Sequence, residues 1–439
     1  MNDRSVRFFS KPARLAWAGA GAMLLCSTVA VAATDVRVWH ALSPHNKDVF
    51  EGLVKDFNRS QKDVMVKLKA FDSPDAVEAA IEAAKSRDDK PHLAQLDDHR
   101  SQNDLASRDY VQPLHALLSK HPIKDAKWFL SEQNTYLRDT KNRLLAFPYM
   151  TEVPVMFYNL DAFKTAGITP PVPQRAWSGL QDQLVSLANN GSRKCPLTSD
   201  QSVSVNLENL AAVNNQPYTT SGNGLVKGTP AFQFDVIYIR HLSLMISWVR
   251  SELMLKPEND VKAVERFANR ECAVLFSGSG NIGLFQNSRG LNFAVSGLPY
   301  YPQVTQTPGS PFVSGSAIWA IAGHSKEHDA ASAQFLEWLA QPKQAAEWYQ
   351  KTGFLPLTQQ AFATTSASYY KDLGDWRNLA AAYEKAPGQT SRGFRVNNYP
   401  KIKTMFRATL DRALNGEQPA VTALRYASVE AGKLMREKK

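Results

Sequence analysis

The feature that most constrains the fold is an alternation of strand-like and helix-like segments that begins near residue 34. Residues 34–39 and 64–71 alternate apolar and polar side chains as strands do, and residues 91–96 form a third short strand. The segments between them, residues 47–58 and 75–85, have the apolar spacing of helices. This order predicts a parallel sheet with crossover helices, and therefore an α/β fold.

Polar residues follow the three predicted strands. They are His40, Asp72 to Asp75, and the pair Asp97 and Asp98. In open α/β sheets, ligands bind beyond the carboxyl ends of the strands. We therefore expect a ligand site at this edge of the sheet.

The second half of the chain has a different pattern. Apolar residues repeat at spacings of three and four from Ile239 to Leu253, which predicts a helix. Ser325 is placed to cap another helix. Further helices are expected over 177–188 and 404–436, and strands over 271–276, 292–298 and 312–322. The strand over 271–276 ends in the turn Ser277-Gly278-Ser279-Gly280.

No linker rich in Pro, Gly or Ser separates two successive domains. The chain is instead expected to cross between two lobes more than once, at residues 146–163 and 292–302. Two α/β lobes that share a ligand cleft would account for these crossings. The predicted division is a signal peptide at 1–32, lobe 1 at 33–150 plus 292–325, and lobe 2 at 151–291 plus 326–439.

The first 32 residues have the pattern of a secretory signal peptide. Arg4, Arg7, Lys11 and Arg14 precede an apolar run from residue 15 to 31, and Ala30-Val31-Ala32 fits a small-x-small cleavage site. The alternative is an N-terminal membrane anchor, for which the run is short and interrupted by glycines. Cleavage would lower the formal net charge from +10 to +7 and release the protein into the periplasm. No clustered basic face with interleaved aromatic residues indicates nucleic-acid binding.

Two cysteines follow the predicted cleavage site, Cys195 and Cys272. In an exported protein they are candidates for a disulfide, and the alternative is a pair of buried thiols. Without a supporting histidine pattern they predict no zinc site. The chain also contains no nucleophile elbow, zinc-protease motif or phosphate-binding loop, so we expect neither an enzyme nor a cofactor.

Several motifs resemble the bacterial extracellular solute-binding proteins of family 1, and within that family the periplasmic glycerol-phosphate receptors of ABC importers. The resemblance covers essentially the whole chain after residue 33. The two most specific motifs are AEWYQKTGFLPLT at 346–358 and RGFRVNNYPKIK at 392–403. GSAIWAIAG at 315–323 and MFYNLDAFKTAGI at 156–168 add to it. It implies a two-lobed receptor of the maltose-binding-protein type that closes about a hinge, acts as a monomer and delivers its solute to a membrane permease.

The resemblance also implies a set of ligand contacts. They fall at Asp75, Asp98, Glu152, Trp177, Ser277, Gly278, Gly315, Phe354 and Lys403. Several of these depart from the glycerol-phosphate receptors, which have Ser at the position of Glu152, Glu at Asp98, Tyr at Phe354, Arg at Lys403 and an aromatic residue at Asp75. The tryptophans expected around 201–204 are missing. The resemblance therefore predicts the fold and the role more firmly than the ligand.

The residues themselves leave two ligand classes open. Lys403 and Arg395 are the best cations for a phosphate, whereas Glu152 and Asp98 suit the hydroxyl groups of a polyol. We expect sn-glycerol-3-phosphate or a glycerophosphodiester, with a neutral mono- or oligosaccharide as the alternative. Structural roles remain open for each residue, such as a helix cap for Asp98 and core packing for Trp177 and Phe354.

Overall fold

The computed structural model describes residues 33–97, 105–190, 194–256, 258 and 260–437. The predicted signal peptide and Asp98 lie outside the described residues. Residues 33–439 form one compact unit that contains two β-sheets. None of the helices in the described part is long and apolar enough to pass through a membrane.

The first sheet contains the predicted parallel strands. Its order is β2 (Val64–Ala70), β1 (Thr34–His40), β3 (Leu93–Asp97), β10 (Ser314–Ile321) and β4 (Val111–Gln112), and β5 (Phe147–Glu152) also pairs with β10. β1 is parallel to both β2 and β3, which confirms the expected arrangement. β10 arrives from much later in the chain and is antiparallel to β3, β4 and β5.

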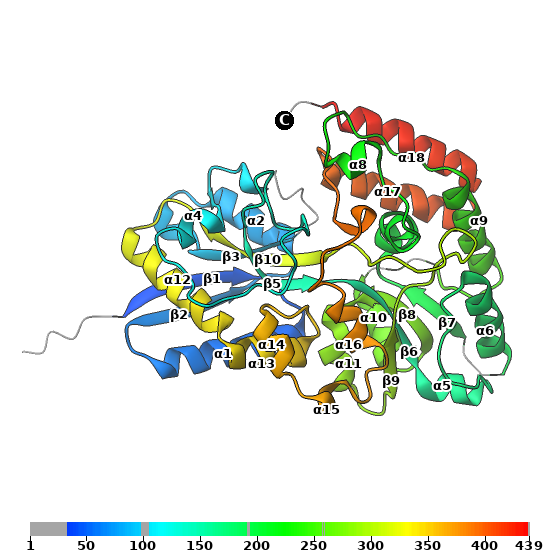
Figure 1. The fold of residues 1–439 in the computed structure, drawn as a ribbon, viewed down its shortest axis with the longest axis horizontal. Helices are drawn as coiled ribbons and strands as arrows, with labels where there is room; N and C mark the ends of the chain where they lie inside the picture. Colours follow the sequence, from blue (N-terminus) through cyan, green and yellow to red (C-terminus); the bar gives the residue numbers. More distant parts are fainter. Residues whose placement is uncertain (1–32, 98–104, 191–193, 257, 259, 438–439) are drawn as a thin grey trace, which may run out of the picture. The chain divides into compact units, whose positions relative to one another are not determined.

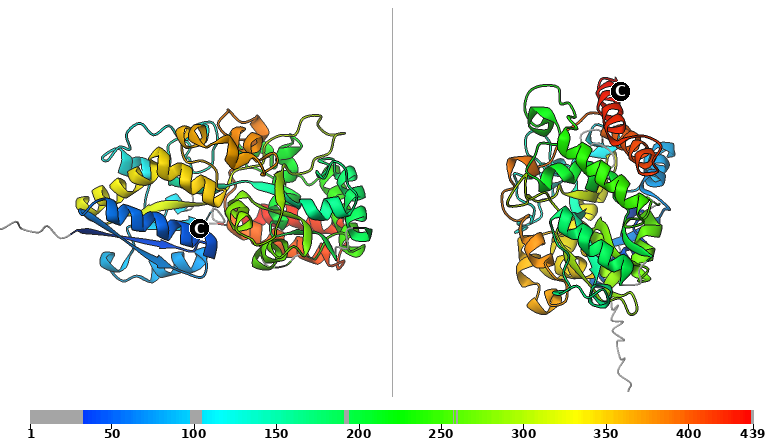
Figure 2. Two further views of the ribbon diagram at one scale, coloured as in Figure 1. Left: turned by 90° about the horizontal axis from the view of Figure 1, so that it is seen from below. Right: turned by 90° about the vertical axis from the view of Figure 1, so that its right-hand side faces the viewer.

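Helices cover the first sheet because its strands alternate between two buried faces. Val36 and Val38 share a core with Phe50 and Leu53 of α1, whereas Trp39 joins Val77 of α2 in a second core. Figures 1 and 2 show α1 and α12 running along this sheet. The helices are α1 (Pro44–Ser60), α2 (Pro74–Ala83), α4 (Leu114–Leu118), α12 (Lys326–Ala340), α13 (Pro342–Thr352) and α14 (Gln359–Thr364), with the short η1 (Arg87–Asp89). We call this sheet with its helices the first region.

The second sheet has the order β7 (Cys195–Ser199), β8 (Cys272–Gly278), β6 (Pro154–Asn159) and β9 (Phe293–Ser296). β7 is parallel to β8, and β6 is antiparallel to both β8 and β9. This sheet and the helices that follow are the second region. They are α5 (Leu160–Thr165), α6 (Trp177–Asn189), α7 (Asn209–Val213), α8 (Thr220–Gly224), α9 (Val236–Arg250), α10 (Asp260–Ala268), α11 (Ile282–Gln286), α17 (Tyr399–Leu414) and α18 (Ala420–Leu434), with η2 (Ser204–Glu208) and η3 (Ser279–Asn281).

The first crossing between the two sheets lies within the predicted segment 146–163, and the second overlaps the predicted segment 292–302. β5 belongs to the first sheet and β6 to the second, so Val153 is the only residue between them. The chain returns between β9 and β10, through residues 297–313. A third passage runs from α14 to α17 and contains α15 (Ala367–Tyr370), α16 (Trp376–Ala381) and η4 (Gln389–Ser391).

The predicted lobe boundaries need correction in two places. β9 was expected in lobe 1, but it pairs with β6 in the second sheet. α12 and α13 were expected in lobe 2, but α12 packs against β1 and α13 against α1 in the first region. Both errors arise because periodicity shows that a strand or helix forms, whereas its partner is chosen by contacts far along the chain.

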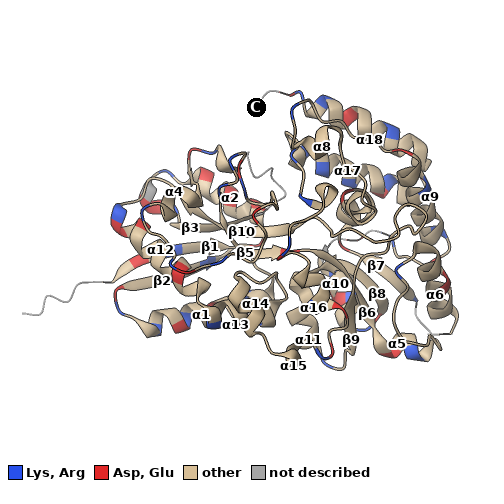
Figure 3. Cartoon of the chain, viewed as in Figure 1, with Lys and Arg blue, Asp and Glu red and all other residues tan. Residues whose placement is uncertain are grey.

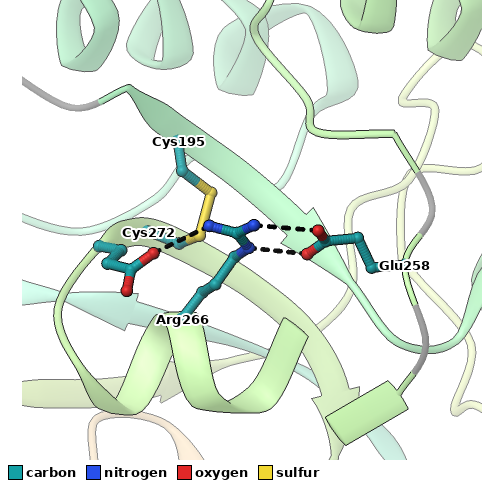
Figure 4. Close-up of a disulfide and its surroundings, with 5 residues drawn as sticks. Cys195, Glu258, Arg266 and Cys272 are labelled. Atoms are coloured by element: carbon teal, nitrogen blue, oxygen red, sulfur yellow. Dashed lines mark hydrogen bonds and ion pairs between the residues drawn. A yellow bond between two sulfur atoms is a disulfide. The ribbon is translucent and has the colours of Figure 1, made fainter. Parts of the chain in front are cut away.

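A disulfide joins Cys195 and Cys272, the pair that the sequence singled out. The two residues face each other in the parallel ladder of β7 and β8, 77 residues apart in the chain. Figure 4 shows Arg266 beside this bond, where its guanidinium binds Glu258 at 2.7 and 3.0 Å and Glu271 at 2.9 Å. The ends of β7 and β8 are thus linked covalently and flanked by an ion-pair network.

Candidate functional site

Glu152 lies at the point where the chain leaves the first sheet for the second. It is the last residue of β5 and is partly exposed, in contrast to its buried neighbours Thr151 and Val153. Its carboxylate oxygen Oε2 accepts a hydrogen bond from the backbone N–H of Gly280 at 3.0 Å. The carboxylate of a first-sheet strand is therefore fixed by the backbone that follows β8 of the second sheet.

Two glycines make this approach possible. A Cβ atom at Gly278 would lie 2.2 Å from Glu152 Oε2, and one at Gly280 would lie 2.8 Å from the same oxygen. Real Cβ atoms essentially never come that close, so a side chain at either position would displace the carboxylate. The two glycines of the Ser-Gly-Ser-Gly turn thus leave space for the Glu152 carboxylate.

Gly315 of β10 lies close against the backbone of Glu152. It lies opposite Thr151 in the ladder of β10 and β5 and has a φ of +98°, which favours glycine. A Cβ atom here would lie 2.4 Å from the Met150 carbonyl and 3.0 Å from Glu152 Cγ. The Gly315 carbonyl accepts a hydrogen bond from Tyr136 Oη at 2.7 Å.

Phe354 is mostly a core residue. Its side chain is 8% exposed and stacks on Trp348, with ring centroids 5.6 Å apart. The edge of its ring lies against Gly280, where a Cβ atom would come within 2.6 Å of Phe354 Cε1. Phe354 can therefore offer a ligand only the ring edge beside Glu152. The structure thus brings together four residues that the resemblance had implied, Glu152, Gly278, Gly315 and Phe354.

Ser277 takes part in a polar cluster that sequence reasoning missed. Its hydroxyl is fully buried, donates to Asp200 Oδ2 at 2.7 Å and accepts from Asn281 Nδ2 at 2.9 Å. Asp200 directly follows β7, and Ser277 belongs to the neighbouring strand β8. The missed signal was available, because Asp200 is a polar residue at the carboxyl end of a strand, as His40 is.

Trp177 lies in the core of the second region, which fits the packing role that the sequence left open beside the ligand contact implied by the resemblance. It is 2% exposed, and its indole packs against His241, Trp248 and Phe276 at centroid distances of 4.6, 5.8 and 5.9 Å. Because aromatic side chains surround the ring, the structure gives it a packing role. Periodicity within α6 fits this burial, since Leu180, Leu184 and Leu187 are buried with it.

Lys403 faces a carboxylate. Its Nζ lies 3.5 Å from Glu208 Oε1, and the Glu208 side chain is only 6% exposed. Glu208 ends the π-helix η2 and also accepts a hydrogen bond from Tyr399 Oη, which in turn contacts Tyr218 Oη at 3.0 Å. Burial, followed by the charge of Glu208, raises the pKa of Tyr399, so this hydroxyl stays protonated.

Two other charged residues that the sequence singled out, Arg395 and Asp75, have different surroundings. Arg395 Nη2 donates to the carbonyls of Arg138 and Asp139 at 3.1 and 2.9 Å, and burial lowers its pKa while Asp139 opposes that effect. Asp75 is exposed in the first turn of α2.

Figure 3 shows acidic and basic residues interspersed along the helices, including α12 and α18. Within the described ranges, His, Cys, Asp and Glu form no group of three that would hold a metal ion.

Comparisons with known proteins agree with this architecture. A family model for bacterial extracellular solute-binding proteins matches residues 52–374. The sn-glycerol-3-phosphate-binding periplasmic protein UgpB of Rhizobium meliloti is 30% identical over 409 residues, which is 92% of this chain and 94% of that protein.

Solved structures show the same fold at low identity. UgpB from Mycobacterium tuberculosis in complex with glycerophosphocholine superimposes with a TM-score of 0.71 at 16% identity, covering 92% of this chain and 99% of that one. A maltose-bound protein of T. maritima gives a TM-score of 0.74 at 15% identity, covering 92% and 100%. The predicted maltose-binding-protein-like fold is thereby confirmed. The chain belongs to the family of bacterial extracellular solute-binding proteins.

Proposed function

We propose that this protein is the receptor of an ABC importer for sn-glycerol-3-phosphate or a glycerophosphodiester, which it delivers to the membrane permease. The observation that carries the proposal is the convergence of Glu152, Gly278, Gly315 and Phe354 at the crossing between the two sheets. These are positions at which the resemblance to the glycerol-phosphate receptors implies ligand contacts. The similarity to UgpB of Rhizobium meliloti over 92% of the chain supports the same ligand class.

The charges of the site favour the diester within this proposal. A phosphate monoester carries close to two negative charges at pH 7, whereas a diester carries one. Lys403 already faces the buried Glu208, and Arg395 binds two backbone carbonyls. Glu152 would also repel a phosphate, since two unit charges about 5 Å apart interact by roughly 3 kcal/mol at an effective dielectric constant near 20.

A neutral saccharide is the second candidate, and a specific observation favours it. Glu152, Asp200 and Asn281 are partly exposed and offer carboxylate and amide groups, which suit sugar hydroxyls. A hydrogen bond from a hydroxyl to a charged acceptor contributes roughly 1.5–3 kcal/mol. The maltose-bound protein of T. maritima, which has the same fold, supports this alternative.

A thermal-shift screen of residues 33–439 separates the two classes. The panel is sn-glycerol-3-phosphate, glycerophosphocholine, maltose, trehalose and glucose. A ligand at about 100 times its dissociation constant adds roughly 2.7 kcal/mol of stability, which shifts the midpoint measurably. A shift with the phosphates alone supports the proposal, and a shift with a sugar alone replaces it with the saccharide hypothesis.

Glu152→Gln then tests the site, because the two ligand classes respond in opposite directions. The substitution removes a like charge near a phosphate, so we expect affinity for the phosphate ligand to rise about tenfold or more. Affinity for a neutral sugar should instead fall, since a charged acceptor is lost. Glu417→Gln, at an exposed position, is the matched control. Unchanged affinity for every ligand in Glu152→Gln would remove Glu152 from the site.

A further inference from the structure

A small pocket is lined by Val153, the residue that follows Glu152, and by the start of β6. It has a volume of about 220 Å³. The pocket is lined by all three passages between the sheets: Val153 and Val155 from the first, Gly297 and 308–311 from the second, and α16 from the third.

One wall of the pocket carries a cation. The Arg175 guanidinium is partly buried, and Nε and Nη2 donate to the Leu298 carbonyl at 3.4 and 3.2 Å. A Cβ atom at Gly297 would lie 2.5 Å from Nη2, so the glycine makes room for this side chain. Among the described residues Nη1 has no hydrogen-bond partner, although a guanidinium has five N–H donors.

The lining of the pocket also carries a carboxylate. Asp375 lies at the start of α16, where its backbone N–H donates to the Val295 carbonyl at 2.9 Å and Oδ1 accepts from Asn378 Nδ2 at 2.9 Å. Both Arg175 and Asp375 line the pocket, and among the described residues no ion pair of 4.0 Å or less joins them. Burial lowers the pKa of Arg175, and the charge of Asp375 opposes this.

We propose that this pocket binds a small zwitterion, the size of glycine or alanine, with its carboxylate on Arg175 and its ammonium on Asp375. A liquid water occupies about 30 Å³, so the pocket has room for about seven waters, or for one such zwitterion together with a few waters. An anion alone would meet the repulsion of Asp375, and a cation alone that of Arg175. Arginine suits a carboxylate because its planar fork binds both oxygens. The apolar parts of Val155, Pro311 and Leu379 leave space for a short carbon chain.

Occupancy would act on the connection between the sheets. The zwitterion would contact Val153, one residue from Glu152, and would bridge the first and third passages. A ligand that binds one arrangement of these passages better than another shifts the equilibrium between them. The inference concerns a site separate from the proposed solute site and does not depend on which solute is carried.

Isothermal titration calorimetry of residues 33–439 with glycine, L-alanine, acetate and methylammonium tests the inference. We expect saturable binding of the two zwitterions with a dissociation constant of about 1 mM, and at least about tenfold weaker binding of either single ion. Absence of saturable zwitterion binding up to about 100 mM overturns the proposal. Acetate that binds as well as glycine overturns it too, because it shows an anion site only.

Two variants locate the binding. Asp375→Asn keeps the shape and the bond from Asn378 but removes the charge, and we expect at least about a tenfold loss of glycine affinity while acetate affinity rises. Arg175→Gln should lose affinity for both glycine and acetate. Arg377→Gln, exposed on α16 and absent from the pocket lining, is the matched control. Because Arg175 also supports the Leu298 backbone, Asp375→Asn is the deciding variant, and glycine affinity unchanged in it refutes the assignment.

Discussion

The first region is held by aromatic packing, whereas the second adds a covalent link and buried polar networks. In the first, Phe50, Tyr149 and Trp348 lie with ring centroids 4.5–6.0 Å apart behind the sheet. In the second, the disulfide joins β7 to β8, and Glu208 is buried beside Tyr399. The second sheet has only four strands, so its region relies less on sheet pairing alone.

Each region also has its own group that responds to solution conditions. In the first, the rings of His324 and His328 lie 4.2 and 4.5 Å from that of buried His92, whose Nδ1 accepts from the Arg37 backbone N–H at 2.9 Å. In the second, Cys195 and Cys272 respond to reductant. Burial also lowers the pKa of His241 in α9 to about 3, so acid should act on both regions, whereas reduction should act on the second alone. The following experiments test that contrast.

The largest effect is expected from Trp177→Ala. Removing a buried tryptophan costs about 3–5 kcal/mol, so the second region should lose most of its stability even without ligand. Denaturant unfolding with hydrogen exchange on β8 measures the loss. Trp177→Phe, which keeps an aromatic ring, should cost less. If Trp177→Ala leaves stability intact and weakens only solute binding, Trp177 is a ligand residue and not core.

Replacing both cysteines by alanine should cost about 2–4 kcal/mol. The bond closes a loop of 77 residues in the unfolded chain, and its loss releases that constraint. Hydrogen exchange should speed up in β7 and β8 while β1 and β2 stay protected. Equal loss of protection in both sheets would show that the two regions unfold as one unit, and the contrast between them would disappear.

In the first region, acid should act through His92. Burial, with smaller contributions from His324, Arg37 and His328, lowers the pKa of His92 to about 3. The folded pKa is below the ordinary value of about 6.5, so the stability contributed by neutral His92 is complete above that pH and is lost as pH falls toward 3. At pH 5 the loss is about 2 kcal/mol.

Urea unfolding at pH 7 and pH 5 measures this dependence. Arg37 opposes protonation of His92 and His324, and Asp329 favours protonation of His324. In His92→Gln the difference between the two pH values should shrink, whereas in His121→Gln, outside the cluster, it should persist. A difference that is the same in both variants would assign the acid sensitivity to other groups.

The smallest effect is expected from Lys403→Met, about 1 kcal/mol. The substitution leaves the buried Glu208 carboxylate without its cation, but Tyr399 continues to donate to it. The double variant with Glu208→Gln should recover part of the loss. Thermal unfolding without ligand measures the loss of stability in both variants. Abolished binding of a phosphate ligand at unchanged stability would instead place Lys403 in the solute site.

Local patterns predicted most of the elements and the crossing at Glu152. The alternation from residue 34 to 96 indicated β1, α1, β2, α2 and β3 in parallel pairing, because crossover helices leave few arrangements. Ser325 caps α12 as expected, with its hydroxyl accepting from the His328 N–H. These predictions depend on residues close together in the chain.

The features that the sequence did not predict depend on pairs of residues that are far apart in the chain. The bond between Glu152 and Gly280 spans 128 residues, and that between Ser277 and Asp200 spans 77. Glu208 and Lys403 meet across the second region, and neither position has a local pattern that names the other. Trp177 shows the same limit, since an aromatic residue at the start of a helix has the same sequence pattern in a core as in a binding site.

The place of β10 has a consequence for how the protein is made. β10 lies inside the first sheet, between β3 and β4, yet it follows every strand of the second sheet in the chain. At about 5–20 residues per second, synthesis reaches it roughly 10–45 s after β3 emerges from the ribosome. During that interval the N-terminal half has no completed sheet to fold around. A chain with a predicted signal peptide would benefit, because an incompletely folded precursor can still be threaded through a secretion channel.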